Sequence, residues 1–154
     1  MSLTRTFARS PKGERVTGSV PSGRGANTTI MASLSLKGIN SIMTIEGSTD
    51  TAVFSAYVEN FLLPTIKKGD VVVLDNYGPH KSPKIETLIK SKGARPLFLP
   101  PYHPEYNPIE NAWSKIKSIL RTLEARTRKD LDKGIVKAAK QISKQDILGW
   151  SQFP

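Results

Sequence analysis

The spacing of apolar residues in the first half of the chain changes from strand-like to helix-like and back. Residues 28–36 and 41–45 have the composition of strands, and the turn residues 38–40 separate them, which predicts an antiparallel hairpin. Apolar side chains then recur every three or four residues over 53–62, which predicts an amphipathic helix. Residues 71–74 are a short unbroken apolar run, which predicts a parallel strand buried on both faces.

The same alternation continues toward the C-terminus. Ser82 and Pro83 suit the start of a helix that ends before Gly93, and residues 95–99 read as the next strand. Asn107 and Pro108 open a longer helix that reaches Leu123, and a last helix is predicted over 128–144. The order predicts an α/β fold with a mixed sheet: the hairpin pairs antiparallel, and strands joined through helices pair parallel.

Composition narrows the classes of function. The chain has 154 residues, 38% of them hydrophobic, a net charge of +10, no cysteine and two histidines. The absence of cysteine excludes a disulfide scaffold and Cys-ligated zinc or iron–sulfur sites, so a metal must be held mainly by carboxylates. The excess positive charge favours a polyanionic partner such as nucleic acid. No stretch is long and apolar enough for a membrane span or a secretory signal, so we expect a soluble intracellular protein.

The positive charge is concentrated in two stretches. Residues 115–144 carry a net charge of +7, and an N-terminal segment rich in glycine and proline carries +4 within residues 5–24. The second stretch has the composition of a basic arm. Both stretches are also compatible with solvated faces that bind nothing, although their coexistence in one chain favours nucleic acid.

Asp75 is the first candidate for chemistry. It follows the predicted strand 71–74 directly, and ligands of α/β sheets bind beyond the carboxyl ends of the strands. The alternative is that its carboxylate only accepts hydrogen bonds from the loop backbone.

Glu110 is the second candidate, and it also has a structural alternative. With Asn107 as N-cap, Glu110 falls at the third helical position, where a glutamate forms a capping box. However, the proline-rich loop 100–106 brings this helix start toward the sheet edge that bears Asp75. Two carboxylates there would form a hard-oxygen site for Mg²⁺ or Mn²⁺.

Two motifs together resemble a known family. Residues 74–80 read LDNYGPH and residues 100–113 read PPYHPEYNPIENAW, with 34 residues between Asp75 and Glu110. This wording and spacing resemble the catalytic domain of mariner-superfamily transposases, specifically their bacterial insertion-sequence branch. Segment 5–15, the hairpin and the helix that bears Trp113 resemble the family too, whereas His103 stands where relatives commonly carry Ser.

The resemblance implies a ribonuclease H-like fold and a DDE endonuclease. Asp75 and Glu110 would then be catalytic and metal-binding, in a site for two Mg²⁺ or Mn²⁺ ions that supports DNA cleavage and strand transfer during transposition. Double-stranded DNA, comprising transposon ends and target, would be the partner of a homodimer, in the bacterial cytoplasm near the nucleoid and without a membrane role. The basic residues expected to hold DNA phosphates are Arg5, Arg9, Lys12, Arg15, Lys115, Lys117 and Arg121. His80 is expected to form local hydrogen bonds, and Trp113 to anchor the core.

The resemblance also implies that the first catalytic Asp and its strand are missing. That Asp would precede the segment at which this chain begins, and neither Asp50 nor Asp70 matches its position. We therefore expect an incomplete domain, inactive as given: an arm (1–25), a partial core (26–123) and a basic C-terminal helix and tail (124–154). A gap should then separate the hairpin from the strand at 71–74, unless the arm or a neighbouring chain fills it. Two alternatives are a catalytically dead remnant that binds DNA or a partner, and a ribonuclease H-like nuclease acting on RNA.

Overall fold

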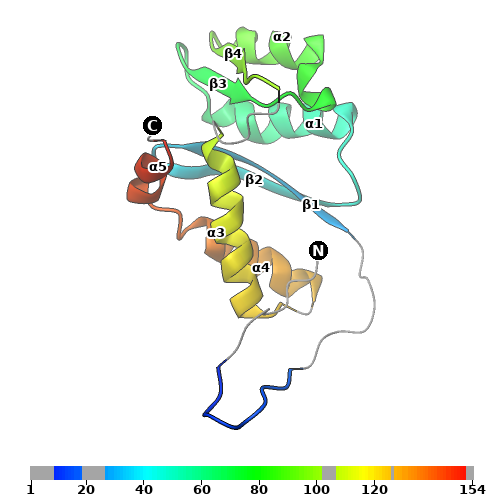
Figure 1. The fold of residues 1–154 in the computed structure, drawn as a ribbon. Coiled ribbons are helices and arrows are strands. Elements are labelled where there is room, and N and C mark those ends of the chain that lie inside the picture. Colours follow the sequence, from blue (N-terminus) through cyan, green and yellow to red (C-terminus); the bar gives the residue numbers. More distant parts are fainter. Residues whose placement is uncertain (1–8, 19–26, 102–106, 126, 152–154) are drawn as a thin grey trace.

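The computed structural model describes residues 9–18, 27–101, 107–125 and 127–151, and it has a mixed α/β architecture (Figure 1). The strands are β1 (Thr28–Ser35), β2 (Gly38–Glu46), β3 (Val71–Leu74) and β4 (Arg95–Phe98). The α-helices are α1 (Thr51–Tyr57), α2 (Pro83–Ser91), α3 (Pro108–Leu123), α4 (Arg128–Ala139) and α5 (Lys144–Trp150). A π turn (Val58–Leu62) and a 3-10 turn (Leu63–Thr65) extend α1, and a second 3-10 turn (Gly78–Lys81) precedes α2.

The strands form two separate pairs. β1 and β2 pair antiparallel, and β3 and β4 pair parallel with Val71 opposite Arg95 and Leu74 opposite Phe98. Within the described residues the two pairs share no ladder hydrogen bonds, which matches the predicted gap between the hairpin and the strand at 71–74. The described part of the arm, residues 9–18, does not fill this gap; it is exposed and extends away from β3 (Figure 1).

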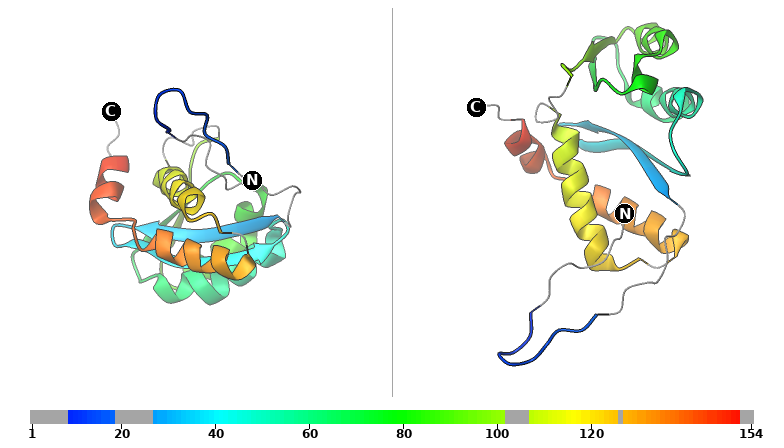
Figure 2. Two further views of the ribbon diagram at one scale, coloured as in Figure 1. Left: turned by 90° about the horizontal axis from the view of Figure 1, so that it is seen from below. Right: turned by 45° about the vertical axis from the view of Figure 1, so that its right-hand side comes forward.

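The hairpin lies between two hydrophobic clusters (Figure 2). One cluster joins one face of the hairpin to α1, α2 and β3, around Phe54, Val58 and Ile85. The other joins the opposite face to α3, α4 and α5, around Ile116 and Ile135. Trp113 packs against this second cluster, as predicted.

Two local predictions were wrong. The hairpin turn lies at residues 36 and 37, because Gly38 adopts a φ of +112° and pairs directly with Ser35, while a bulge between Ser33 and Leu34 adjusts the register. The segment predicted as one last helix over 128–144 contains a break: α4 ends at Ala139, and a separate helix, α5, begins at Lys144. Ser143 has an extended backbone and forms a capping box with Asp146, so it starts a new helix and does not continue the old one.

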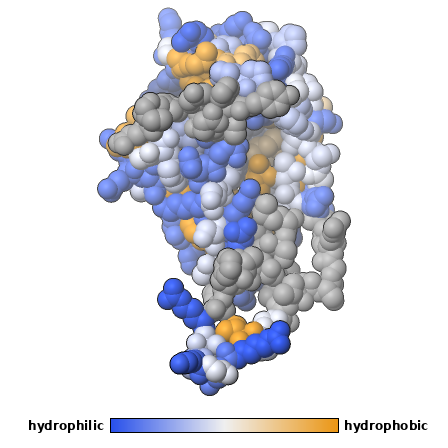
Figure 3. Space-filling model, viewed as in Figure 1, coloured by the Kyte–Doolittle hydropathy of each residue, from blue (hydrophilic) through white to orange (hydrophobic). Residues whose placement is uncertain are grey.

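The prediction that β3 is buried on both faces was also wrong. Val71 and Val73 are 46% and 48% exposed, and Leu97, opposite Val73, is 43% exposed. Leu74, in contrast, is buried, because it lies on the face of the β3–β4 pair that α1 and α2 cover. Figure 3 shows hydrophobic surface over β3 and β4. No helix within the described ranges is long and apolar enough to cross a membrane.

Candidate active site around Asp75

Asp75 follows directly on the carboxyl end of β3, and its side chain is 46% exposed. Its Oδ1 accepts a hydrogen bond from the backbone N–H of Tyr77 at 2.9 Å and lies 2.5 Å from Nδ1 of His80. Among the described residues, Oδ2 has no hydrogen-bond partner. Asp75 does therefore accept from the loop backbone, as the structural alternative predicted, yet no described residue occupies its Oδ2, the oxygen that a cation would meet.

His80 lies in the 3-10 turn Gly78–Lys81, where Pro79 occupies one of the first positions. Because a carboxylate only accepts, Nδ1 of His80 is the donor in the contact with Asp75. The imidazole packs on the ring of Phe54, with centroids 4.0 Å apart, and meets the edge of Tyr77 at 5.4 Å. Phe54 is buried in α1. The predicted local hydrogen bond of His80 is confirmed, and its target is the candidate catalytic carboxylate.

The loops that follow β3 and β4 are tied together. Nδ2 of Asn76 donates to the carbonyl oxygen of Leu99, and the N–H of Leu99 donates to the carbonyl oxygen of Leu74 at 2.8 Å. The hydroxyl of Tyr77 donates to the carbonyl oxygen of Thr49 at 3.2 Å. These bonds fix the backbone around Asp75 from three segments, which gives its carboxylate a defined direction.

Glu110 lies exposed in the first turn of α3. Asn107 caps this helix, because its Oδ1 accepts from the N–H of Ile109 at 3.4 Å. The capping box predicted as the alternative for Glu110 is not among the hydrogen bonds of the described residues. Its carboxylate is thus not engaged by the helix start. Figures 1 and 2 show that the N-terminal end of α3 is its end nearer to β3 and β4, and that the helix runs from there toward α4. The meeting of Glu110 and Asp75 stays a prediction.

Metal binding is chemically compatible with these carboxylates. Carboxylate oxygens are the preferred ligands of Mg²⁺ and Mn²⁺, and a free Oδ2 on a carboxylate whose Oδ1 is anchored suits such a ligand. In the described part of the chain, no three His, Asp or Glu side chains gather closely enough to hold a metal ion.

The basic residues predicted to hold DNA differ in their availability. Arg9, Lys12 and Arg15 are exposed in segment 9–18, whereas Arg5 and the unusual loop residue His103 lie outside the described residues. Lys117 is partly buried. Arg121 is also partly buried, and its Nε has no hydrogen-bond partner among the described residues.

Lys115 is engaged within the molecule. Its Nζ lies 2.6 Å from Oδ2 of Asp146, and this contact together with hydrogen bonds from Ser143 lowers the pKa of Asp146 to about 2. Lys115 thereby ties α3 to α5.

Arg128 has a structural role that its charge alone did not predict. It makes two 3.1 Å hydrogen bonds to the carboxylate of Asp132 and one of 3.0 Å to the hydroxyl of Thr44, and it lies 3.6 Å from Glu46. It therefore joins α4 to the hairpin. The i,i+4 spacing of Arg128 and Asp132 was the available signal for the first contact.

The fold and a carboxylate at a strand end describe a nuclease-like α/β domain. The sequence profile of the DDE superfamily endonucleases matches residues 2–132, so the chain belongs to this family. No curated protein sequence matches the chain.

Solved structures of Mos1 transposase share the fold. The paired-end complex with the left transposon end has a TM-score of 0.76 at 11% identity, over 97% of this chain and 48% of that one. The Mos1 mariner paired-end complex with Mn has a TM-score of 0.74 at 13% identity, over 96% of this chain and 46% of that one. The catalytic domain of Mos1 mariner transposase has a TM-score of 0.69 at 12% identity, over 80% of this chain and 67% of that one. The chain thus spans about half the length of the chains in those two complexes, and its fold is ribonuclease H-like, as predicted.

Proposed function

We propose that this chain is the catalytic domain of a transposase from the bacterial insertion-sequence branch of the mariner superfamily. Such an enzyme cleaves DNA at transposon ends and joins those ends to target DNA. The observation that carries the proposal is the carboxylate of Asp75, which Tyr77 and His80 hold at the end of β3 and whose Oδ2 no described residue occupies. Membership of the DDE superfamily endonucleases and the 34-residue spacing to Glu110 support it.

In this proposal Asp75 and Glu110 hold Mg²⁺ or Mn²⁺, as two of the three carboxylates of a DDE site. The metals, when bound, activate a water or a DNA 3′-hydroxyl and stabilise the leaving oxygen of an in-line phosphoryl displacement. His80 orients Asp75, and the exposed cations Arg9, Lys12 and Arg15 hold phosphates without reading bases. We also propose that the active complex is a homodimer on double-stranded DNA in the bacterial cytoplasm.

The chain as given is proposed to lack activity until a third carboxylate is supplied. No trio of His, Asp or Glu side chains forms within the described ranges, which favours this reading. The same observation favours a second candidate function, a transposase remnant that binds DNA or a partner without cutting.

A plasmid-nicking assay tests the proposal. The chain, alone and extended at its N-terminus by an added strand that carries the expected first Asp, is incubated with supercoiled plasmid and Mn²⁺. We expect nicking by the extended chain, and its loss in Asp75→Ala and Glu110→Ala but not in Glu86→Gln, which alters a carboxylate of α2. Nicking that survives both active-site substitutions would refute the assigned residues. An extended chain that binds duplex DNA without cutting would favour the remnant, and failure to bind duplex DNA would revive a role on RNA.

A further inference from the structure

Helix α4 carries its lysines on one side. They are Lys129, Lys133, Lys137 and, at the C-cap, Lys140, and all four are exposed. At about 100° and 1.5 Å per residue, they fall within a sector of about 80° along roughly 16 Å of helix. The buried side of the helix consists of Gly134, Ile135 and Ala138. The four lysines thus form one continuous cationic face, here called the α4 lysine face.

No described residue neutralises the charges of the α4 lysine face. None of its four lysines makes an ion pair with another described residue. The two acids of the helix are occupied elsewhere: Asp130 accepts from the hydroxyl of its N-cap Thr127 at 2.7 Å, and Asp132 is held by Arg128. Lys115, in contrast, is paired with Asp146. The structure therefore distinguishes the engaged Lys115 of α3 from the four lysines of α4, which have no ion-pair partner among the described residues.

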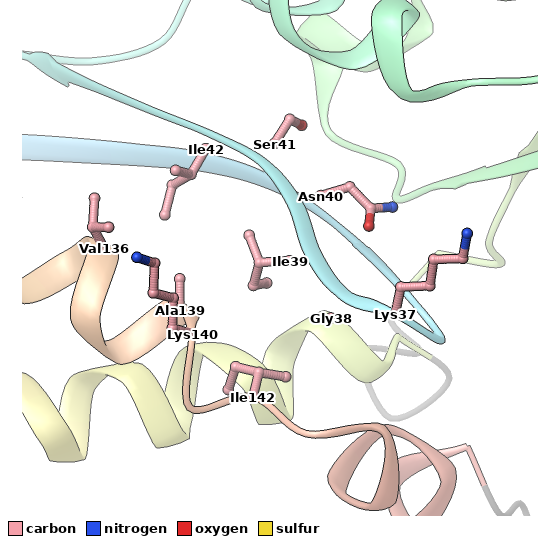
Figure 4. A pocket seen from close by; sticks show the side chains of 10 residues that line it. All are labelled: Lys37, Gly38, Ile39, Asn40, Ser41, Ile42, Val136, Ala139, Lys140 and Ile142. Atoms are coloured by element: carbon pink, nitrogen blue, oxygen red, sulfur yellow. The ribbon is translucent and has the colours of Figure 1, made fainter.

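The cationic surface continues onto the hairpin. An open hollow of about 340 Å³ lies between the start of β2 and the end of α4, and Lys37 and Lys140 both line it (Figure 4). Its apolar lining includes Ile39 and Ile42 from β2 and Val136 from α4. Lys37, at the hairpin turn, thereby extends the α4 lysine face by one more exposed charge.

This surface and Asp75 lie on opposite sides of the hairpin. α4 packs in the cluster of Ile116 and Ile135 on one hairpin face, whereas β3, which leads to Asp75, packs in the cluster of Phe54 and Ile85 on the other. Figures 1 and 2 show α4 and β3 separated by β1 and β2. A phosphate bound at the α4 lysine face would therefore be separated from Asp75 by the hairpin.

We propose that the α4 lysine face, together with Lys37, binds the backbone of a duplex DNA segment other than the one at Asp75. This inference rests on the proposed function. About 16 Å of duplex axis presents roughly five phosphates per strand, so a row of single charges of that length can contact several of them. The exposed side of α4 bears no aromatic or amide side chain that would read base edges, which fits sequence-independent contact.

The test is the salt dependence of binding to a short duplex, measured by fluorescence anisotropy in EDTA so that cleavage is not involved. The test variant is Lys129→Gln, Lys133→Gln and Lys137→Gln together. The control removes the same charge from α2, with Lys84→Gln, Lys90→Gln and Lys92→Gln. Because Gln and Lys have similar helix propensity, both variants should fold, which thermal melts confirm.

We expect the slope of log affinity against log salt to fall by about 2.7 in the test variant, as three lost phosphate contacts require. Between 50 and 200 mM salt, the unmodified chain should therefore lose roughly 40-fold more affinity than the test variant. The control should keep the original slope. An unchanged slope in the test variant, or an equal change in the control, would overturn the proposal.

The two proposals fail separately. If the slope falls by about 2.7 in the test variant but the extended chain never nicks DNA, the α4 lysine face stands and the proposed catalytic function fails. If the extended chain nicks DNA but the test variant binds with the original slope, the catalytic function stands and the α4 lysine face does not bind the duplex.

Discussion

His80 donates to Asp75 over 2.5 Å, and the same imidazole lies against the ring of the buried Phe54. The candidate catalytic carboxylate is therefore oriented through one side chain by the hydrophobic core beneath it. Substitution of a residue that holds a metal ligand in this way typically costs roughly 10-fold to 100-fold in metal affinity or activity.

His80→Ala should weaken Mn²⁺ binding by roughly 10-fold to 100-fold, because Asp75 loses the donor that orients it. Electron paramagnetic resonance of free Mn²⁺, in solutions of the chain extended by the added Asp-bearing strand, measures the change. Lys81→Ala, at the exposed neighbouring position, is the control and should leave the affinity unchanged. Equal Mn²⁺ affinity in the His80 variant and the unmodified chain would show that the contact has no role in metal binding.

The Lys115–Asp146 pair should influence stability in acid. The pKa of Asp146 is about 2 in the folded chain, against an unfolded value of about 3.9. A lowered pKa contributes stability that is fully present above the unfolded value and is lost as pH falls through the folded one. Urea midpoints should therefore fall between about pH 4 and pH 2 partly because of this group. Lys115→Met should make this acid loss smaller, because the folded pKa of Asp146 then lies nearer its unfolded value. Lys117→Met, on the same helix, should not.

Tyr57 should influence stability in alkali. Its side chain is buried, which raises the pKa of its hydroxyl, and the hydroxyl oxygen lies 2.8 Å from that of Ser41. A raised pKa means that stability is present below the ordinary value near 10 and falls above it. Tyr57→Phe should cost about 0.5–1.5 kcal/mol at neutral pH and reduce the alkaline loss. Denaturant unfolding at pH 7 and above pH 10 tests this; an alkaline loss of the original size in the variant would exclude Tyr57 as its source.

Gly134 allows α3 and α4 to approach closely. A Cβ at this position would lie 3.0 Å from Cδ2 of Leu120 and 3.3 Å from Cδ1 of Leu123. Gly134→Val should destabilise the chain by about 1–3 kcal/mol through overpacking. In Gly134→Ala, the gain in helix propensity of about 1 kcal/mol should offset much of the crowding. Thermal melts of both variants would contradict the close approach if the Val variant were as stable as the Ala variant.

The open face of β3 predicts an asymmetry between two valines. Val73→Thr should change stability by less than about 0.5 kcal/mol, because Val73 is 48% exposed. The same substitution at the fully buried Val58 should cost about 1–3 kcal/mol, because it buries a hydroxyl. Equal large losses at both positions would mean that the open face is covered in solution.

Features that depend on near neighbours in the chain could be predicted from the sequence. Asp50 and Asn107 cap the helices that follow them, the strand at 71–74 and the long helix at 108–123 have the predicted bounds, and Asn76 orients its loop. Caps, turns and periodic apolar faces are set within a few residues, so they are readable locally. The break before α5 also has a local signal, because Ser143 and Asp146 have capping-box spacing. The apolar periodicity that continues through Ile142 nevertheless favoured one uninterrupted helix.

The availability of each functional side chain was decided only by the tertiary structure. Lys115 is engaged because Asp146, 31 residues away, lies beside it, and Asp75 is anchored because Phe54 supports His80 from another helix. Val71 and Val73 are exposed because no described element covers that face of β3. The sequence by itself determined which residues can carry charge or chemistry. Their partners and their exposure depend on packing between distant segments, which no local pattern encodes.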